Sequence, residues 1–318
     1  MTKIIMDQYY DIIGDTHGCH DTLVSLLETL GYKQGQYGFE HPSRKAIFVG
    51  DFIDRGPRQL EVIDTVRAMV DTGHAYAVMG NHEFNAIAYV TTDHTYGGYL
   101  RAHSERNART HRAFLDAMAD HPERYDEVIN WFKTLPLWLD LDGVRVIHAC
   151  WDQSGIDRIS KAYNPNGQLT EDLIENGNDP KKWEFHVLDN LLKGKTVKLQ
   201  DDNAFTDPNG IKRTNMRIRW WDTQATTHKA AFIGPKKDIE HIDDSPIDPS
   251  EFIPYPSDAA PLFIGHYWMQ GKPKPLAHNI ACVDYSIAKR HGKLCAYRWD
   301  GEAQIDPDKF IEVPRLEA

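Results

Sequence analysis

The chain has 318 residues and a formal net charge of −11 at pH 7. Hydrophobic residues make up 41% of it and charged residues 26%, values near globular averages that argue against a disordered or membrane-embedded chain. A charge this negative repels polyanions, so extended nucleic-acid binding is not expected, although a local cationic pocket for one phosphate stays compatible with it.

Residues that would indicate export or membrane insertion are missing from the sequence. No run approaches the ~18 apolar residues of a membrane-spanning helix, so no membrane partner is expected. The N-terminal segment lacks a continuous apolar region and a small-residue cleavage site, which argues against a secretory signal. The four cysteines have no C-x-x-C spacing and fit a reducing compartment better than a disulfide framework. We therefore expect a cytoplasmic protein.

The first third of the chain repeats a strand followed by a polar loop, with helical patterns between the strands, which predicts βαβ units and a mostly parallel sheet. The first unit has a strand at 9–13, a polar loop at 14–18 and a helix that stops at Gly31. Further strands are expected at 46–49 and 75–79, and a helix through 60–70 lies between them. Each strand ends in glycine and polar residues, at the carboxyl edge where open α/β sheets bind ligands.

The rest of the chain is less regular. Residues 91–138 are polar and largely helical and are expected to form an insertion or cap, and a strand at 144–147 follows. Residues 155–261 are expected to form a second insertion, whose clearest element is an amphipathic helix near 185–192. A strand is expected at 262–264, and a final hairpin through 281–283 and 294–299. We expect one domain, 1–318, that carries both insertions.

Six polar side chains each come just after an apolar strand: Asp15, His17, Asp51, Asn81, His148 and His266. Oxygen and imidazole ligands suit manganese, iron or zinc, whereas a closed structural zinc site uses thiolates. A carboxylate such as Asp51 can give one oxygen to each of two ions, and two ions can clamp the attacking and leaving oxygens of an in-line displacement. Taken alone, Asp15 could instead cap the following helix, and His148 and His266 could be ordinary buried histidines.

Several short strings at these strand ends resemble the calcineurin-like metallophosphoesterases, specifically their serine/threonine protein phosphatase branch. They are GDTHG at 14–18, GDFIDRG at 50–56, GNHE at 80–83, the single histidine at 148, and GHYW at 265–268. Many of these enzymes have a further histidine at the position of Trp268. The protein phosphatase branch also lacks that histidine. The GDFIDRGP string is most similar to small bacterial members, whose relatives include dinucleoside polyphosphate hydrolases and the phosphatase part of a bacterial RNA-repair enzyme.

The resemblance implies an α/β fold, the metallophosphoesterase-type sandwich of two β-sheets flanked by helices, with two divalent metal ions (Mn, Fe or Zn) as cofactors. It also implies which residues hold the metals. Asp15 and His17 would bind the first ion, Asp51 would bridge, and Asn81, His148 and His266 would hold the second.

Catalytic and substrate-binding residues also follow from the resemblance. His82 would be the general acid, with Asp54 orienting it, because an alkoxide leaves badly without a proton. Arg55 would bind phosphate oxygens through its planar guanidinium. Alternatively, His82 could be a plain loop residue, and Arg55 could pair with a nearby carboxylate.

A second phosphate-binding arginine is expected in the family. Arg217 and Arg219 are the candidates in this sequence, although surface charges on a strand would give the same pattern. The segment that contains them cannot be aligned with the family by its motifs.

The expected function is hydrolysis of phosphate monoesters, on a phosphoprotein or a small molecule, by direct attack of a metal-bridging hydroxide on phosphorus. The partner would be a phosphorylated protein, nucleotide or small molecule. The alternative is a hydrolase of dinucleoside polyphosphates of the diadenosine tetraphosphate type. A hypothesis of another class is an inactive scaffold that retains the fold and serves as an interaction surface.

Overall fold

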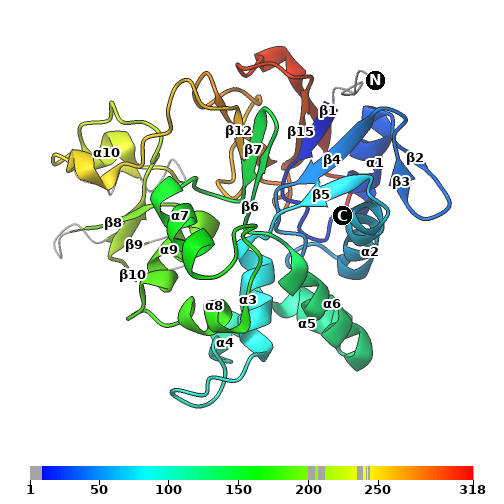
Figure 1. The fold of residues 1–318 in the computed structure, drawn as a ribbon, viewed down its shortest axis with the longest axis horizontal. Coiled ribbons are helices and arrows are strands. Elements are labelled where there is room, and N and C mark those ends of the chain that lie inside the picture. The colour runs from blue at the N-terminus through cyan, green and yellow to red at the C-terminus, as the bar shows by residue number, and fades with distance from the viewer. Residues whose placement is uncertain are drawn as a thin grey trace.

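The computed structural model describes residues 9–199, 205–206, 212–234, 239–240, 242 and 244–317. Two β-sheets pack against each other with helices around them (Figure 1). The larger sheet has the order β14-β15-β1-β4-β5, with β16 paired to β15, and the smaller sheet has the order β13-β12-β7-β6. This is the predicted sandwich of two sheets flanked by helices.

The strands of the larger sheet are β1 (Tyr9–Ile13), β4 (Arg44–Phe48), β5 (Ala75–Ala77), β14 (Asp284–Tyr285), β15 (Lys293–Trp299) and β16 (Phe310–Pro314). Those of the smaller sheet are β6 (Trp138–Leu141), β7 (Val144–Ile147), β12 (Leu262–Ile264) and β13 (Ile280–Cys282). The strands β1, β4 and β5 run parallel, as the repeated strand-and-helix pattern predicts. In the smaller sheet β7, β12 and β13 are also parallel.

The helices are α1 (His20–Leu30), α2 (Gln59–Asp71), α3 (Asn81–Val90), α4 (Glu105–Thr110), α5 (Arg112–Met118), α6 (Pro122–Thr134), α7 (Gln153–Ala162), α8 (Glu171–Asn176), α9 (Trp183–Lys193) and α10 (His228–Ala231). Shorter elements are β2 (Lys33–Gln34), β3 (Phe39–Glu40), β8 (Thr196–Lys198), β9 (Phe205–Thr206), β10 (Lys212–Arg213), β11 (Asn215–Arg217), η2 (Pro249–Glu251) and η3 (Pro307–Lys309). Residues 91–138 are largely helical as predicted, and α9 is the predicted amphipathic helix. None of the helices in the described part of the chain has the length and apolarity to cross a bilayer.

Successive side chains of the central strands belong alternately to two hydrophobic clusters. In β1, Ile12 belongs to the cluster between the sheets, which also contains Val146 and Phe263. The next residue, Ile13, belongs to the cluster under the helices, which contains Leu23. Because successive side chains point to opposite faces of a strand, a strand buried on both sides needs a continuous apolar run. Helix α1 packs against β15 and β16, and α2 packs against β5.

The end of the smaller sheet differs from the prediction. The segment 281–283 was expected to pair with 294–299 in a hairpin, but β13 pairs in parallel with β12. The strand that precedes β15 and pairs with it antiparallel, in place of 281–283, is β14. The chain changes sheet at Val283, whose N–H donates to the carbonyl of Ile264. The predicted partner was wrong because an apolar run is equally suited to either sheet.

A buried ionic network joins β1, β4 and β15. The carboxylate of Asp11 is fully buried and accepts hydrogen bonds from Nε of Arg44 at 3.0 Å and Nε of Arg298 at 2.9 Å. We expect Asp11→Ala to lower the free energy of unfolding by about 1.5–3 kcal/mol, because Arg44 and Arg298 lose a charge-assisted hydrogen bond while Arg44 keeps its ion pair with Asp300. Urea denaturation measures this change, and a loss below about 1 kcal/mol, the value of a surface pair, would contradict it.

Candidate active site

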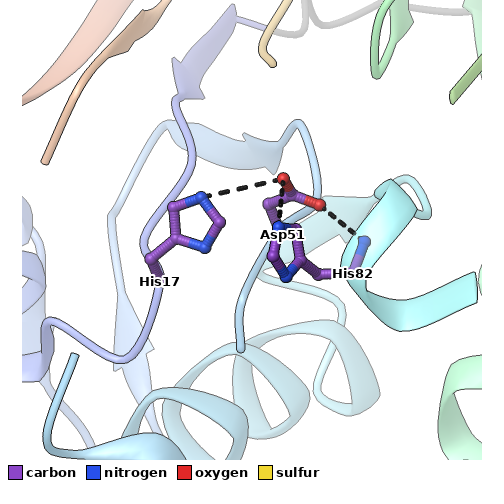
Figure 2. A group of neighbouring side chains, drawn as sticks. All are labelled: His17, Asp51 and His82. Carbon is purple, nitrogen blue, oxygen red and sulfur yellow. Dashed lines mark hydrogen bonds and ion pairs between the residues drawn. The ribbon is translucent and has the colours of Figure 1, made fainter. Parts of the chain in front are cut away.

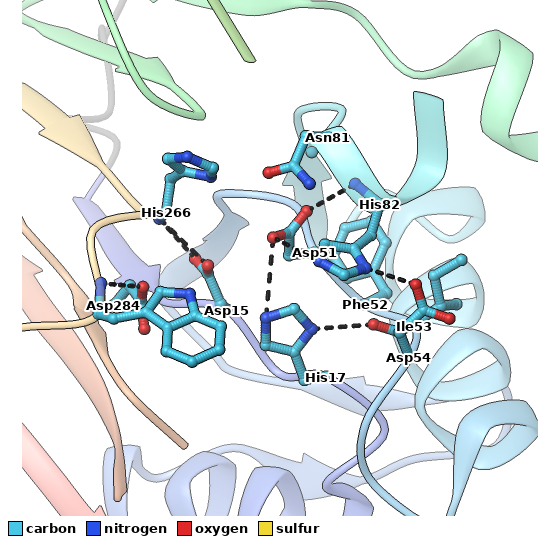
Figure 3. Close-up of polar contacts among 12 residues, drawn as sticks. Asp15, His17, Asp51, Phe52, Ile53, Asp54, Asn81, His82, His266 and Asp284 are labelled. Carbon is cyan, nitrogen blue, oxygen red and sulfur yellow. Dashed lines mark hydrogen bonds and ion pairs between the residues drawn. The ribbon is translucent and has the colours of Figure 1, made fainter. Parts of the chain in front are cut away.

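The predicted ligand residues meet at the carboxyl ends of five strands. Figure 3 labels all of them except His148. Asp15 and His17 follow β1, Asp51 follows β4, Asn81 begins α3 after β5, His148 follows β7, and His266 follows β12. All six side chains are buried. Residues up to 251 positions apart thus contribute to one site, for example where the N–H of His266 donates to Asp15 Oδ2 at 3.1 Å.

The loops that carry these residues have an unusual backbone. Seven described residues other than glycine have a positive φ, and six of them lie in these loops: His17 (42°), Asp51 (55°), Asp54 (69°), Arg55 (71°), His266 (71°) and Trp268 (54°). This region of backbone conformation is uncommon for residues with a side chain and costs about 1–3 kcal/mol for each residue. Such strain clusters at functional sites, so the loops are folded to aim their side chains inward.

Asp51 lies at the centre of the site (Figure 2). Its Oδ2 is 3.7 Å from Nε2 of His17 and 3.8 Å from Nε2 of His82. Its Oδ1 is 3.4 Å from Nε2 of His148 and accepts the backbone N–H of His82 at 3.0 Å. The two carboxylate oxygens therefore face two different sets of imidazoles.

Backbone carbonyls fix the orientation of two of these imidazoles. Nδ1 of His17 donates to the carbonyl of Ile53 at 2.9 Å, and Nδ1 of His148 donates to the carbonyl of Val49 at 2.7 Å. A carbonyl can only accept, so both Nδ1 atoms carry hydrogen and, in the neutral ring, Nε2 keeps its lone pair. Burial lowers the pKa of His17 to about 3, so this ring is neutral and free to act as a ligand.

The composition of the site fits divalent cations. Nε2 of His17 and both ring nitrogens of His266 are buried without a hydrogen-bond partner. Burial, followed by the charges of Asp284 and Asp51, raises the pKa of Asp15 well above its usual range. Buried carboxylates that repel one another, next to unpartnered imidazole nitrogens, are costly unless a cation offsets them.

Two groups of potential ligand atoms can be distinguished. The side-chain ligand atoms of His17, Asp51 and His82 lie within 4.8 Å of one another, and so do those of Asp51, His148 and His266. Asp51 is common to both groups, as a bridging residue would be. Nε2 of His148 also lies 3.2 Å from Oδ1 of Asn81, so this amide oxygen faces the second group.

Glu83 was not predicted to belong to the site, but its carboxylate links two of the loops by hydrogen bonds. Its carboxylate accepts the backbone N–H groups of Asp51 and Phe52, each at 2.8 Å, and of Gly80 at 3.0 Å. A Cβ at Gly80 would lie 2.3 Å from the backbone nitrogen of Asp51, so only glycine allows this approach. In the GNHE string, Gly80 therefore allows close approach of the loop at Asp51, and Glu83 holds the two loops together through hydrogen bonds.

Asp54 holds two histidines at once. Its Oδ2 is 2.5 Å from Nδ1 of His82, and its Oδ1 is 2.8 Å from Nδ1 of His111. Burial raises the pKa of Asp54, but the hydrogen bonds from His111 and His82 outweigh that effect and lower the pKa to about 2. His111 is buried at the junction of α4 and α5, where no sequence motif marked it.

We expect His111→Phe to slow hydrolysis about tenfold, because Asp54 loses one of the two donors that fix its position beside His82. A hydrogen bond to a charged group contributes roughly 1.5–3 kcal/mol, and 1.4 kcal/mol corresponds to a factor of ten. Steady-state kinetics measure the effect, with His94→Ala at an exposed histidine as the control. Wild-type rates in the His111 variant would show that Asp54 is held without it.

The arginine candidates lie in different places. Arg55 and Arg217 line a cavity of ≈ 510 Å³ together with Asp51, His82, His266, Trp268 and Lys289. The guanidinium of Arg55 lies over the ring of Trp268, 4.0 Å from its centroid. Arg219 instead pairs with Asp222 at 3.2 Å and donates to the carbonyl of Ala230, and it does not line the cavity. Of the two later arginines, only Arg217 is in a position to meet a substrate.

Several known proteins resemble this chain. The sequence model of the calcineurin-like phosphoesterases matches residues 10–230. The chain belongs to this family. A matching structure of a protein serine/threonine phosphatase from Saccharomyces cerevisiae has a TM-score of 0.49 and 16% identity, covering 99% of this chain and 82% of that one.

Curated relatives carry narrower names. "Bis(5'-nucleosyl)-tetraphosphatase PrpE [asymmetrical]" from Halalkalibacterium halodurans is 38% identical over 124 residues, or 37% of this chain and 49% of that protein. The protein of the same name from Oceanobacillus iheyensis is 45% identical over 183 residues, or 55% of this chain and 71% of that protein. The chain thus spans about half of the first relative and more of the second.

Proposed function

We propose that this calcineurin-like phosphoesterase hydrolyses dinucleoside polyphosphates. The sequence motifs favoured phosphate monoesters as substrates, with dinucleoside polyphosphates as the alternative. The observation that favours the alternative is the match to relatives named as bis(5'-nucleosyl)-tetraphosphatases, one of them 45% identical over 71% of its length.

The size and lining of the cavity support this proposal. A volume of ≈ 510 Å³ lies within the range of about 300–1,000 Å³ that is usual for small-molecule sites. The cavity is lined by three cationic side chains, Arg55, Arg217 and Lys289, and two of them, Arg55 and Lys289, lie over the ring of Trp268. Such a lining suits a ligand with several phosphates better than it suits a lone phosphate.

We propose that Asp15 and His17 hold one metal ion, that Asn81, His148 and His266 hold another, and that Asp51 contacts both. When bound there, divalent cations supply Lewis-acid neutralisation of the phosphoryl charge.

The remaining steps belong to side chains of this chain. Arg55 binds phosphate oxygens from the cavity wall, with its guanidinium held over Trp268. His82 carries the proton for the leaving oxygen on Nε2, the nitrogen that points toward Asp51, while Asp54 holds Nδ1. Burial lowers the pKa of His82, but the charge of Asp51 and the hydrogen bond to Asp54 outweigh burial and raise this pKa above its usual value.

A substrate panel tests the proposal. The manganese-loaded protein is assayed with diadenosine tetraphosphate, a phosphoserine peptide, AMP and p-nitrophenyl phosphate, and the products are separated by ion exchange. We expect the highest kcat/KM for diadenosine tetraphosphate. A higher value for the phosphopeptide would support the monoester function instead, and no turnover of any substrate at full metal occupancy would support the inactive scaffold.

A further inference from the structure

A second hollow with a strongly basic lining adjoins the active site. It has a volume of ≈ 470 Å³ and is lined by Arg55, Arg109, Thr110, Arg112, Ala113 and Asp116, and we call it the arginine groove. Arg55 also lines the active-site cavity, so the two hollows meet at this side chain. A ligand that extends past Arg55 would enter the groove.

The groove is attached to the catalytic loops by a specific contact. Arg109 and Arg112 flank His111, and Nδ1 of His111 donates to Asp54, the residue just before Arg55. His111 is buried, whereas Arg109 and Arg112 are exposed. The hydrogen bond therefore fixes the α4–α5 junction beside Arg55 and leaves the two flanking guanidiniums at the surface.

Positively charged side chains outnumber negatively charged ones along the groove. Its lining contains three arginines and one carboxylate, Asp116, whose Oδ1 is 3.7 Å from Nη1 of Arg112. No ion pair joins Arg109 to any other residue that the structure describes. In a chain with a net charge of −11, a local cluster of this sign indicates an anionic ligand. Planar guanidiniums match the oxygens of phosphate groups.

We propose that the arginine groove binds the phosphates of a polyphosphate chain that lie beyond the phosphate being cleaved, through Arg109 and Arg112. This inference rests on the proposed function and deepens it, because it assigns the preference for polyphosphates over monoesters to residues of the 91–138 segment. A phosphomonoester reaches Arg55 and has nothing to place in the groove. A dinucleoside tetraphosphate has three further phosphates.

The test compares R109A/R112A with R106A. Arg106 is on α4 together with Arg109, is exposed and does not line the groove, so R106A removes one positive charge nearby where the double variant removes two. We measure kcat/KM for diadenosine tetraphosphate and for p-nitrophenyl phosphate. The ratio of the two values is expected to fall roughly 10- to 100-fold in R109A/R112A, the loss of one or two charge-assisted contacts, and to stay at the wild-type value in R106A. An unchanged ratio in the double variant, or an equal fall in R106A, would overturn the proposal.

A binding measurement separates this inference from the proposed function. Calorimetry gives the affinities of the manganese-loaded wild type and R109A/R112A for inorganic tripolyphosphate and for orthophosphate. We expect the double variant to lose at least tenfold in affinity for tripolyphosphate relative to orthophosphate, and equal losses would overturn the groove. The wild type could fail to cleave diadenosine tetraphosphate while the double variant still loses affinity for tripolyphosphate. In that case the proposed function is wrong and the groove binds an inorganic polyphosphate.

Discussion

Asp51→Asn is expected to abolish hydrolysis of every phosphate substrate and to weaken the binding of both metal ions. Asp51 is the residue common to the two ligand groups, and its Oδ1 and Oδ2 face different imidazoles. An amide is neutral, and only its oxygen can act as a ligand, so it serves two cations poorly. We expect a loss of about 10³-fold or more, since Lewis-acid stabilisation amounts to several kcal/mol.

Metal content and activity are measured together for this variant. The protein is stripped with a chelator, reloaded with increasing manganese, and assayed at each concentration, with metal content determined by mass spectrometry. Asp120→Asn makes the same chemical change at an exposed aspartate and should leave both quantities unchanged. Wild-type turnover of the reloaded Asp51 variant would refute the assignment of Asp51 as the shared residue.

His82→Asn is expected to slow hydrolysis by about 10²–10⁴ while metal content stays intact, the range typical of general acid–base catalysis. Nδ1 of His82 is engaged by Asp54, and Nε2 points toward Asp51, so the ring is oriented to deliver a proton into the cavity. A proton matters most when the leaving oxygen is basic. The loss should therefore be larger on phenyl phosphate than on p-nitrophenyl phosphate, and larger again on phosphoserine.

Asp54→Asn provides the matched comparison for the His82 variant. It removes the carboxylate that orients the imidazole but retains the acid itself, so it should give a milder loss with the same dependence on the leaving group. The rate loss of each variant is measured on both aryl phosphates at the same manganese concentration. Equal losses on all substrates at full metal occupancy would leave His82 as a phosphate-binding or structural residue.

The metal-ligand candidates could be recognised from the sequence because each comes directly after an apolar strand. Parallel strands of one sheet bring their carboxyl ends to one edge, so Asp15, Asp51 and Asn81 could be expected near one another. His148 follows β7 of the other sheet, and its position depends on how the two sheets pack. The same pattern predicted that β1, β4 and β5 run parallel to one another. The strand pattern therefore predicts at which edge of the sheet a residue lies.

Contacts made by the insertions could not be predicted in this way. His111 lies 57 residues from Asp54, in a helical segment without a motif, and only packing of α5 brings them together. Likewise, Arg217 and Arg219 alternate in the sequence, but one lines the cavity and the other pairs with Asp222. Their separation depends on the local path of the chain after β11, which residue pattern alone does not determine.

A crystal structure of the protein grown with manganese, with anomalous data collected at the manganese edge, tests the central claim most directly. We predict two anomalous peaks about 3.5 Å apart, the spacing of two-metal sites, with one oxygen of Asp51 beside each. A single peak at full occupancy, or two peaks remote from Asp51, would contradict the account.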